Sequence, residues 1–193
     1  MTEKDLQIAE VRVREKLKGL DPSLSYHCLT HTFDVLDQCL RIAGAEGITH
    51  EYDLKNLRMA ALYHDTGFLE TYKNHEQKGC EIFLQDTKDF HISEADNEII
   101  KGLIMSTKLP QEPKTWLQRI ICDADLDYLG RDDFFPIADN LRKEFLHYDV
   151  VANEEEWHEL QLKFLTNHSY HTASSARLRD PAKKKHLLKI MNA

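Results

Sequence analysis

The chain has 193 residues and a formal net charge of −8, because 33 aspartates and glutamates outnumber 25 lysines and arginines. This length suits one domain that buries roughly 70% of the surface exposed by its unfolded chain, so we expect no need for disulfides. The acidic balance argues against binding to a nucleic-acid duplex, which requires a basic face.

The four cysteines, Cys28, Cys39, Cys80 and Cys122, lie singly in apolar stretches, with no Cys-x-x-Cys pair. We interpret them as buried thiols in a reducing cytoplasm. The polar N-terminus has no apolar signal core, and no apolar run is long enough to cross a bilayer. We therefore expect a cytoplasmic protein with no membrane partner.

Seven glycines, five prolines and few alternating apolar runs predict an all-α fold. In chain order we expect helices at about residues 4–18, 24–43, 51–65, 75–85, 93–104, 115–123, 133–147, 153–168 and 172–191. Asn74, Ser93 and Asn153 have the residue types that cap helix N-termini. No linker is long enough to separate a second domain, so we expect one domain over residues 1–193.

The doublet His64-Asp65 follows the apolar run 57–62 at the end of a predicted buried helix. Burying two such polar side chains without a partner is unfavourable. Adjacent helical residues diverge by about 100°, so both can reach one ion only at a helix end, where this doublet lies. A metal ion would satisfy the doublet, and so would a hydrogen-bonded His–Asp pair within the core.

Two further side chains could complete a ligand set of two nitrogens and two oxygens. His31 lies four residues after His27 on one face of the predicted second helix, and Asp125 follows the apolar helix at 115–123. Together with His64 and Asp65 they form a candidate metal site.

The order His31, then His64-Asp65, then Asp125 resembles the HD-domain superfamily of metal-dependent phosphohydrolases, over about residues 26–130. Residues 61–67 and 121–126 are similar to the central and closing blocks of that superfamily. Residues 26–31 look like the Tyr-His-x-x-x-His segment of class I cyclic-nucleotide phosphodiesterases. The resemblance implies a compact multi-helix HD bundle, with a metal-binding core at about residues 24–130 and C-terminal helices at 131–193 packed on it.

The resemblance also implies roles for individual residues. His31, His64, Asp65 and Asp125 would bind the metal, and His27 would protonate the departing oxygen. Asp65 or Asp123 could accept a proton from water. The superfamily pattern favours Asp125 over Asp123 as the ligand, which leaves Asp123 a supporting role or simple solvation at a helix end.

His75-Glu76 resembles the block that supplies an extra histidine in two-metal members of the superfamily. Residues 105–108 hold no histidine where those members have another. We therefore expect one metal ion, with His75 lining the pocket or, alternatively, lying in solvent. A site of nitrogen and oxygen ligands suits Mn, Fe, Mg, Ni or Co, and Zn is also compatible.

Basic side chains could contact a phosphate group, since ammonium and guanidinium groups stabilise phosphoryl oxygens. Lys78 and Lys108 are the chosen candidates, ahead of Lys101, Arg177 and Arg179. For each of them a solvated helix face is the alternative interpretation.

We expect the protein to hydrolyse a phosphate ester by attack of metal-activated water. The expected substrate is a phosphomonoester or phosphodiester of a nucleotide. The small phosphate ester is the expected partner, and a homodimer is compatible with the sequence. One alternative is a non-catalytic signalling HD domain that binds a metal or nucleotide. Another is a helical interaction module without metal. A paired-iron oxygenase is disfavoured, because the additional ligands are incomplete.

Overall fold

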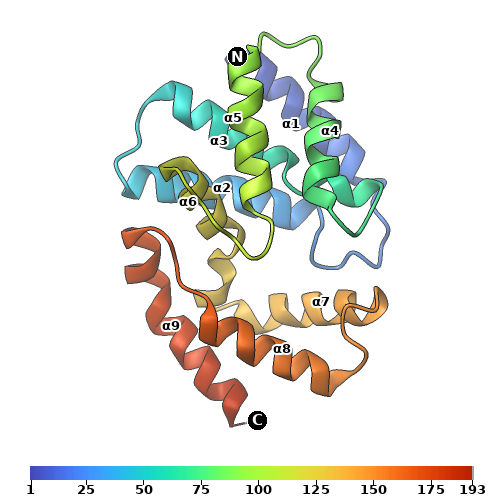
Figure 1. Ribbon diagram of the computed structural model, residues 1–193, viewed down its shortest axis with the longest axis vertical. Coiled ribbons are helices and arrows are strands. Elements are labelled where there is room, and N and C mark those ends of the chain that lie inside the picture. Colours follow the sequence, from blue (N-terminus) through green and yellow to red (C-terminus); the bar gives the residue numbers. More distant parts are fainter. Residues whose placement is uncertain (193) are drawn as a thin grey trace.

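The computed structural model describes residues 1–192, and within them the chain forms nine α-helices, two short 3-10 helices and no strand (Figure 1). The predicted all-α fold is confirmed. The elements are α1 (Glu3–Leu17), α2 (Leu29–Ala45), α3 (Glu51–Tyr63), η1 (Thr66–Leu69), α4 (His75–Asp86), α5 (Glu94–Ser106), α6 (Trp116–Asp125), η2 (Asp127–Gly130), α7 (Phe134–His147), α8 (Glu154–Asn167) and α9 (Ala173–Met191).

Two of the three predicted N-caps make the expected hydrogen bonds. Ser93 accepts from the Asp96 backbone N–H at the start of α5, and Asn153 accepts from two backbone N–H groups at the start of α8. Asn74 holds the N-cap position of α4 with φ 57°, but its side chain makes no cap hydrogen bond. It accepts instead from Lys108 Nζ at 2.9 Å. Asn74 is thus the N-cap residue of a helix that begins at His75, as predicted, but it lacks the side-chain hydrogen bond that is typical of a cap.

The predicted helix at 24–43 begins later than expected, since α2 starts at Leu29. The backbone N–H groups of Tyr26 and His27 donate to Glu144 Oε2 at 2.9 and 3.1 Å. Because Glu144 lies in α7, a contact from the far end of the chain holds residues 26–27 outside the helix. The placement of His27 on one helical face with His31 is wrong.

Buried apolar side chains form two clusters. The first joins α1 to α6 and includes Leu57, Met59 and Phe83, while the second joins η2 to α7, α8 and α9 and includes Phe134 and Trp157. Figure 1 shows α7, α8 and α9 as a separate lower layer beneath the other helices. The two layers therefore have different cores.

A buried ion cluster connects the two layers. Asp127 of η2 is fully buried, and its carboxylate lies 2.7 Å from Arg41 of α2 and 2.7 Å from Arg179 of α9. At Gly130 a Cβ atom would lie 2.4 Å from the carbonyl oxygen of Arg179, so only glycine permits this close approach of η2 and α9. The single-domain organisation over 1–193 stays a prediction, and residue 193 lies outside the described residues.

Three of the four cysteines are buried, Cys28 is half-buried, and all four are free thiols. None of the helices within residues 1–192 combines the length and apolar character that crossing a membrane requires.

Candidate metal centre

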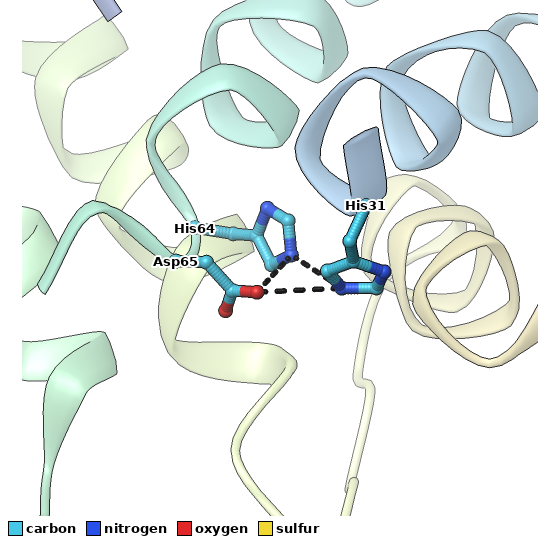
Figure 2. Close-up of side chains that lie close together, drawn as sticks. All are labelled: His31, His64 and Asp65. Carbon is cyan, nitrogen blue, oxygen red and sulfur yellow. Dashed lines mark hydrogen bonds and ion pairs between the residues drawn. The ribbon is translucent and has the colours of Figure 1, made fainter. Parts of the chain in front are cut away.

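His31, His64 and Asp65 converge on one point at the junction of α2 and α3. Their ligand atoms all lie within 4.8 Å of one another, and Figure 2 shows the three side chains pointing together. Asp65 Oδ2 lies 3.3 Å from His31 Nε2 and 3.2 Å from His64 Nε2. The helix α3 ends at Tyr63, which lets the two consecutive residues His64 and Asp65 face the same point.

Asp125 brings a fourth ligand atom to this point from the end of α6. Its Oδ1 lies 3.2 Å from His31 Nε2 and 3.7 Å from His64 Nε2. The structure thus gathers all four residues that the sequence selected as ligands. Their role as ligands remains a prediction.

The hydrogen bonding of His64 suits a ligand. Its Nδ1 lies 2.8 Å from the carbonyl oxygen of Ala61, which can only accept, so Nδ1 carries the proton. Nε2 is then the nitrogen with a lone pair, and it faces His31 and Asp65. A histidine that ligates a metal usually donates its other nitrogen in this way.

The charges of the site also suit a cation. Burial lowers the pKa of His31, but the carboxylates of Asp125 and Asp65 outweigh burial and raise it to about 10. Burial raises the pKa of Asp65, but the neighbouring His64 and His31 lower it to well below the usual value. A proton on His31 therefore balances two carboxylates, and a divalent ion could take the place of that proton.

One oxygen of Asp65 shows whether these residues fit a metal ion. Asp65 Oδ2 is buried and accepts no hydrogen bond within the described residues, although it lies at the meeting point of the two imidazoles. An unsatisfied buried carboxylate oxygen is unfavourable unless a cation binds it. The donor set of two imidazoles and two carboxylates fits a divalent ion of the kind expected from the sequence.

His27 lies beside this cluster and is held by Glu144. The His27 Nδ1 contacts Glu144 Oε1, and the Tyr72 hydroxyl donates to the same oxygen at 3.1 Å. Glu144 is fully buried; burial raises its pKa, but the contact with His27 outweighs burial and lowers it. The sequence did not single out Glu144, although a carboxylate next to the apolar residues Phe145 and Leu146 was a signal.

His75 faces the cluster from the first turn of α4 and does not point into open solvent. Its Nε2 lies 3.6 Å from Asp65 Oδ1, and its ring stacks on Phe68 with centroids 3.9 Å apart. Gly67 makes this position possible, because a Cβ there would lie 1.9 Å from the carbonyl oxygen of His75. His75 lines the same cavity as Asp65.

Asp123 faces away from the metal cluster and towards α9. Both of its oxygens accept hydrogen bonds, from the backbone N–H of His171 and from the backbone N–H and hydroxyl of Thr172, at 2.6 to 2.8 Å. Of the roles considered for Asp123, these contacts favour the supporting one over proton acceptance.

The two lysines selected for phosphate binding differ in their surroundings. Lys78 is paired with Glu70 at 3.3 Å and Glu81 at 2.6 Å, and it does not line the cavity. Lys108 lines the cavity with Asp65. The position of Lys108 therefore suits phosphate contact better than that of Lys78.

These features define an all-α protein in which buried His31, His64 and Asp65, together with half-buried Asp125, lie beside a cavity. The sequence model of the HD domain matches residues 28–127, more than half of the chain. The chain therefore belongs to the HD domain superfamily of metal-dependent phosphohydrolases. The family resemblance predicted from the sequence is confirmed. Neither the curated proteins nor the solved structures include a match.

Proposed function

We propose that this protein hydrolyses a phosphomonoester or phosphodiester with one divalent metal ion. The observation that carries the proposal is the convergence of ligand atoms from His31, His64, Asp65 and Asp125 beside a cavity of about 740 Å³ that Asp65 and Asp125 line. Family membership supports the same reaction class. A nucleotide ester was the substrate expected from the sequence, and it remains one candidate.

The four side chains would hold the metal between α2, α3 and α6. A bound divalent ion supplies a Lewis acid that polarises a phosphoryl oxygen and lowers the pKa of a water molecule. Asp65 Oδ2 lies against His31 and His64, while Oδ1 faces His75, so with a metal bound this carboxylate would be placed to orient a water molecule and accept its proton.

His27 is the proposed general acid. Glu144 binds Nδ1 and fixes the ring, so the other nitrogen, Nε2, is left for the departing oxygen. His27 lines the cavity together with Asp65 and Lys108. Lys108 can neutralise phosphate charge at the same end of the cavity.

A substrate panel tests the proposal. Protein loaded with Mn should release product from bis(p-nitrophenyl) phosphate, p-nitrophenyl phosphate, nucleoside monophosphates or cyclic nucleotides. His64→Gln should abolish release, while His50→Gln, which changes an exposed histidine, should match the unaltered protein. A metal-loaded protein that binds nucleotides but hydrolyses none of these esters would favour the non-catalytic signalling alternative.

A further inference from the structure

The cavity beside the metal cluster extends far beyond it, into the layer of α7 and α8. We call this inner part the α7–α8 chamber; it is lined by Leu141, Phe145, Trp157, Leu160, Phe164 and Leu165. The backbones of α7 and α8 approach each other closely at few points, because α7 packs on η2 and α8 packs on α9. Their side chains meet where Phe145 lies edge-on to Trp157, with ring centroids 5.9 Å apart. The whole cavity, at about 740 Å³, is within the size range of ligand pockets.

The lining of the chamber is chemically one-sided. Every side chain that α7 contributes to the cavity is apolar, and so is every one from α8 except Gln161. Of the four tyrosines that line the cavity, two have engaged hydroxyls: Tyr72 donates to Glu144, and Tyr148 shares a hydrogen bond with Ser23. The other two are Tyr26 and Tyr128. Within the described helices α7 and α8, Gln161 alone therefore offers the chamber a polar side chain.

Apart from Gln161 of α8 and Asp149, which follows α7, most polar and charged residues of the lining come from segments around the metal cluster. His75, Lys108 and Asn74 form one connected group there, since Lys108 donates to Asn74 and Asn74 precedes His75. Asp65 faces His75 in the same group. The cavity thus has a polar end suited to phosphate and an apolar end suited to a group with few hydrogen-bonding atoms.

We infer that the substrate is a phosphate ester of a large apolar alcohol, with the phosphate at the metal cluster and the alkyl or aryl group in the α7–α8 chamber. This inference rests on the proposed function. A nucleobase and ribose carry many polar atoms, and each one left unpaired in such a lining weakens binding. An alkyl chain instead gains free energy with each methylene that it buries.

The reaction balances without a further reactant. Water forms a new bond to phosphorus as the bond from phosphorus to the alcohol oxygen breaks. The alcohol oxygen takes a proton from His27, and the water proton passes to Asp65. The products are the apolar alcohol and phosphate, or a phosphomonoester if the substrate is a diester.

A homologous series of alkyl phosphates tests the inference, because their leaving groups differ little in reactivity. With the Mn-loaded protein we expect kcat/KM to rise roughly fifteenfold from butyl to hexyl phosphate and again to octyl phosphate, since each of the two added methylenes contributes a factor of about four. Adenosine 5′-monophosphate should react more slowly than octyl phosphate. A flat series, with hydrolysis of adenosine 5′-monophosphate as fast or faster, would overturn the inference and leave the proposed function standing.

A pair of variants locates the effect. Leu160→Trp narrows the chamber and should remove the dependence on chain length. Leu162→Trp changes a half-buried leucine of the same helix that does not line the cavity, and it should keep that dependence. If both variants lose the dependence of kcat/KM on chain length, or if both keep it, binding of the alkyl group in the chamber is contradicted. Circular dichroism checks that both variants fold.

A binding measurement without turnover separates the assignment of the chamber to the alkyl group from the proposed hydrolytic function. The chain has two tryptophans, so Trp116→Phe leaves Trp157, in the chamber wall, as the only fluorophore of that kind. Octyl phosphate should change the Trp157 fluorescence with a Kd at least tenfold lower than that of butyl phosphate. If no ester is hydrolysed, the proposed function fails. Equal Kd values for the two esters would overturn the assignment of the chamber.

Discussion

Asp123 and Asp125 lie two residues apart in α6 and contact different parts of the protein. Asp123 accepts three hydrogen bonds from His171 and Thr172, whereas Asp125 faces His31. We predict that Asp123→Asn lowers the free energy of unfolding by about 1–3 kcal/mol, because an amide can accept at only one of its two positions. The variant should still bind one metal ion per chain.

Asp125→Asn should instead weaken metal affinity at least tenfold, because it removes a proposed ligand. Denaturant unfolding of both metal-free proteins and elemental analysis of both loaded proteins check the pair. Loss of metal from the Asp123 variant alone would show that the wrong aspartate has been placed in the site.

Glu144 is a positioning residue that acts through His27. Glu144→Gln keeps the size of the side chain but replaces an acceptor of His27 Nδ1 with an amide, so we predict that turnover slows by a factor of about 10 to 100. Metal content should be unchanged, because Glu144 contacts none of the four proposed ligands. The alkaline limb of the pH profile of turnover should also move, because a general acid must be protonated to act, and a purely structural role would not cause this.

The control for Glu144→Gln is Glu159→Gln, an exposed change on α8 that should leave turnover unaltered. A Glu144 variant with normal turnover and a normal pH profile would remove Glu144 from the mechanism.

At the scale of elements, the contact of η1 with α4 places His75 beside Asp65. The Cβ of Gly67→Ala would overlap the His75 backbone, so the two elements must separate. We predict that this variant lowers the free energy of unfolding by more than about 2 kcal/mol, in the range of overpacked sites. Gly44→Ala in α2 is the matched control, because its Cβ meets nothing within 4 Å and the change should stabilise the helix by up to about 1 kcal/mol. Equal stability of the two variants, measured by denaturant unfolding, would contradict the close packing.

The junction of α8 and α9 should respond to pH through His168. Burial and the charge of Lys183, whose Nζ lies 3.2 Å from His168 Nδ1, lower the pKa of His168 to about 4. The folded protein thus holds His168 neutral, and the associated stability is present above about pH 6.5 and is lost as the pH falls towards 4. We predict that this residue contributes on the order of 2–3 kcal/mol to the fall in the free energy of unfolding over that range.

His168→Gln should reduce that fall, while His158→Gln should not. Denaturant unfolding at several pH values between 4 and 7 measures the free energy of unfolding of each variant. Because the carboxylates titrate in both variants, their effect cancels in the difference. Identical pH dependence in both variants would contradict the assignment.

Local signals in the sequence predicted most helix boundaries, whereas distant contacts decided the exceptions. Ser93 and Asn153 marked helix starts correctly, because a cap acts on residues two or three positions away. The start of α2 was missed, since Glu144 binds the backbone of residues 26–27 from more than 100 positions away. No local pattern in the sequence predicts such a pairing. The side chain of Asn74 likewise accepts from Lys108, a residue distant in the sequence, instead of capping its own helix.

The candidate site shows the same division. The metal cluster could be predicted because His64-Asp65 and Asp125 each end an apolar helix, and the family pattern links them to His31. The α7–α8 chamber could not be predicted, because the same apolar side chains would fit an ordinary core. Whether such side chains line a cavity or fill a core depends on the spacing of α7 and α8, which the sequence does not show.

At the scale of the whole molecule, two layers with separate cores meet at the cavity. The HD match ends at residue 127, so α7, α8 and α9 lie outside the matched region but supply Glu144 and the chamber. In the proposed account, the first layer supplies the ligand set, and the second supplies Glu144 and the chamber. A cytoplasmic location, a homodimer and the absence of duplex binding stay predictions.

The most direct test of the account is a metal titration of the metal-free protein with phosphate release as the readout. We predict that hydrolysis of p-nitrophenyl phosphate is absent with chelator and rises with Mn to a plateau at one equivalent per chain. His64→Gln should bind no equivalent and release no phosphate. Full activity in the presence of chelator, or one bound Mn with no hydrolysis of any ester, would contradict a metal-dependent phosphohydrolase.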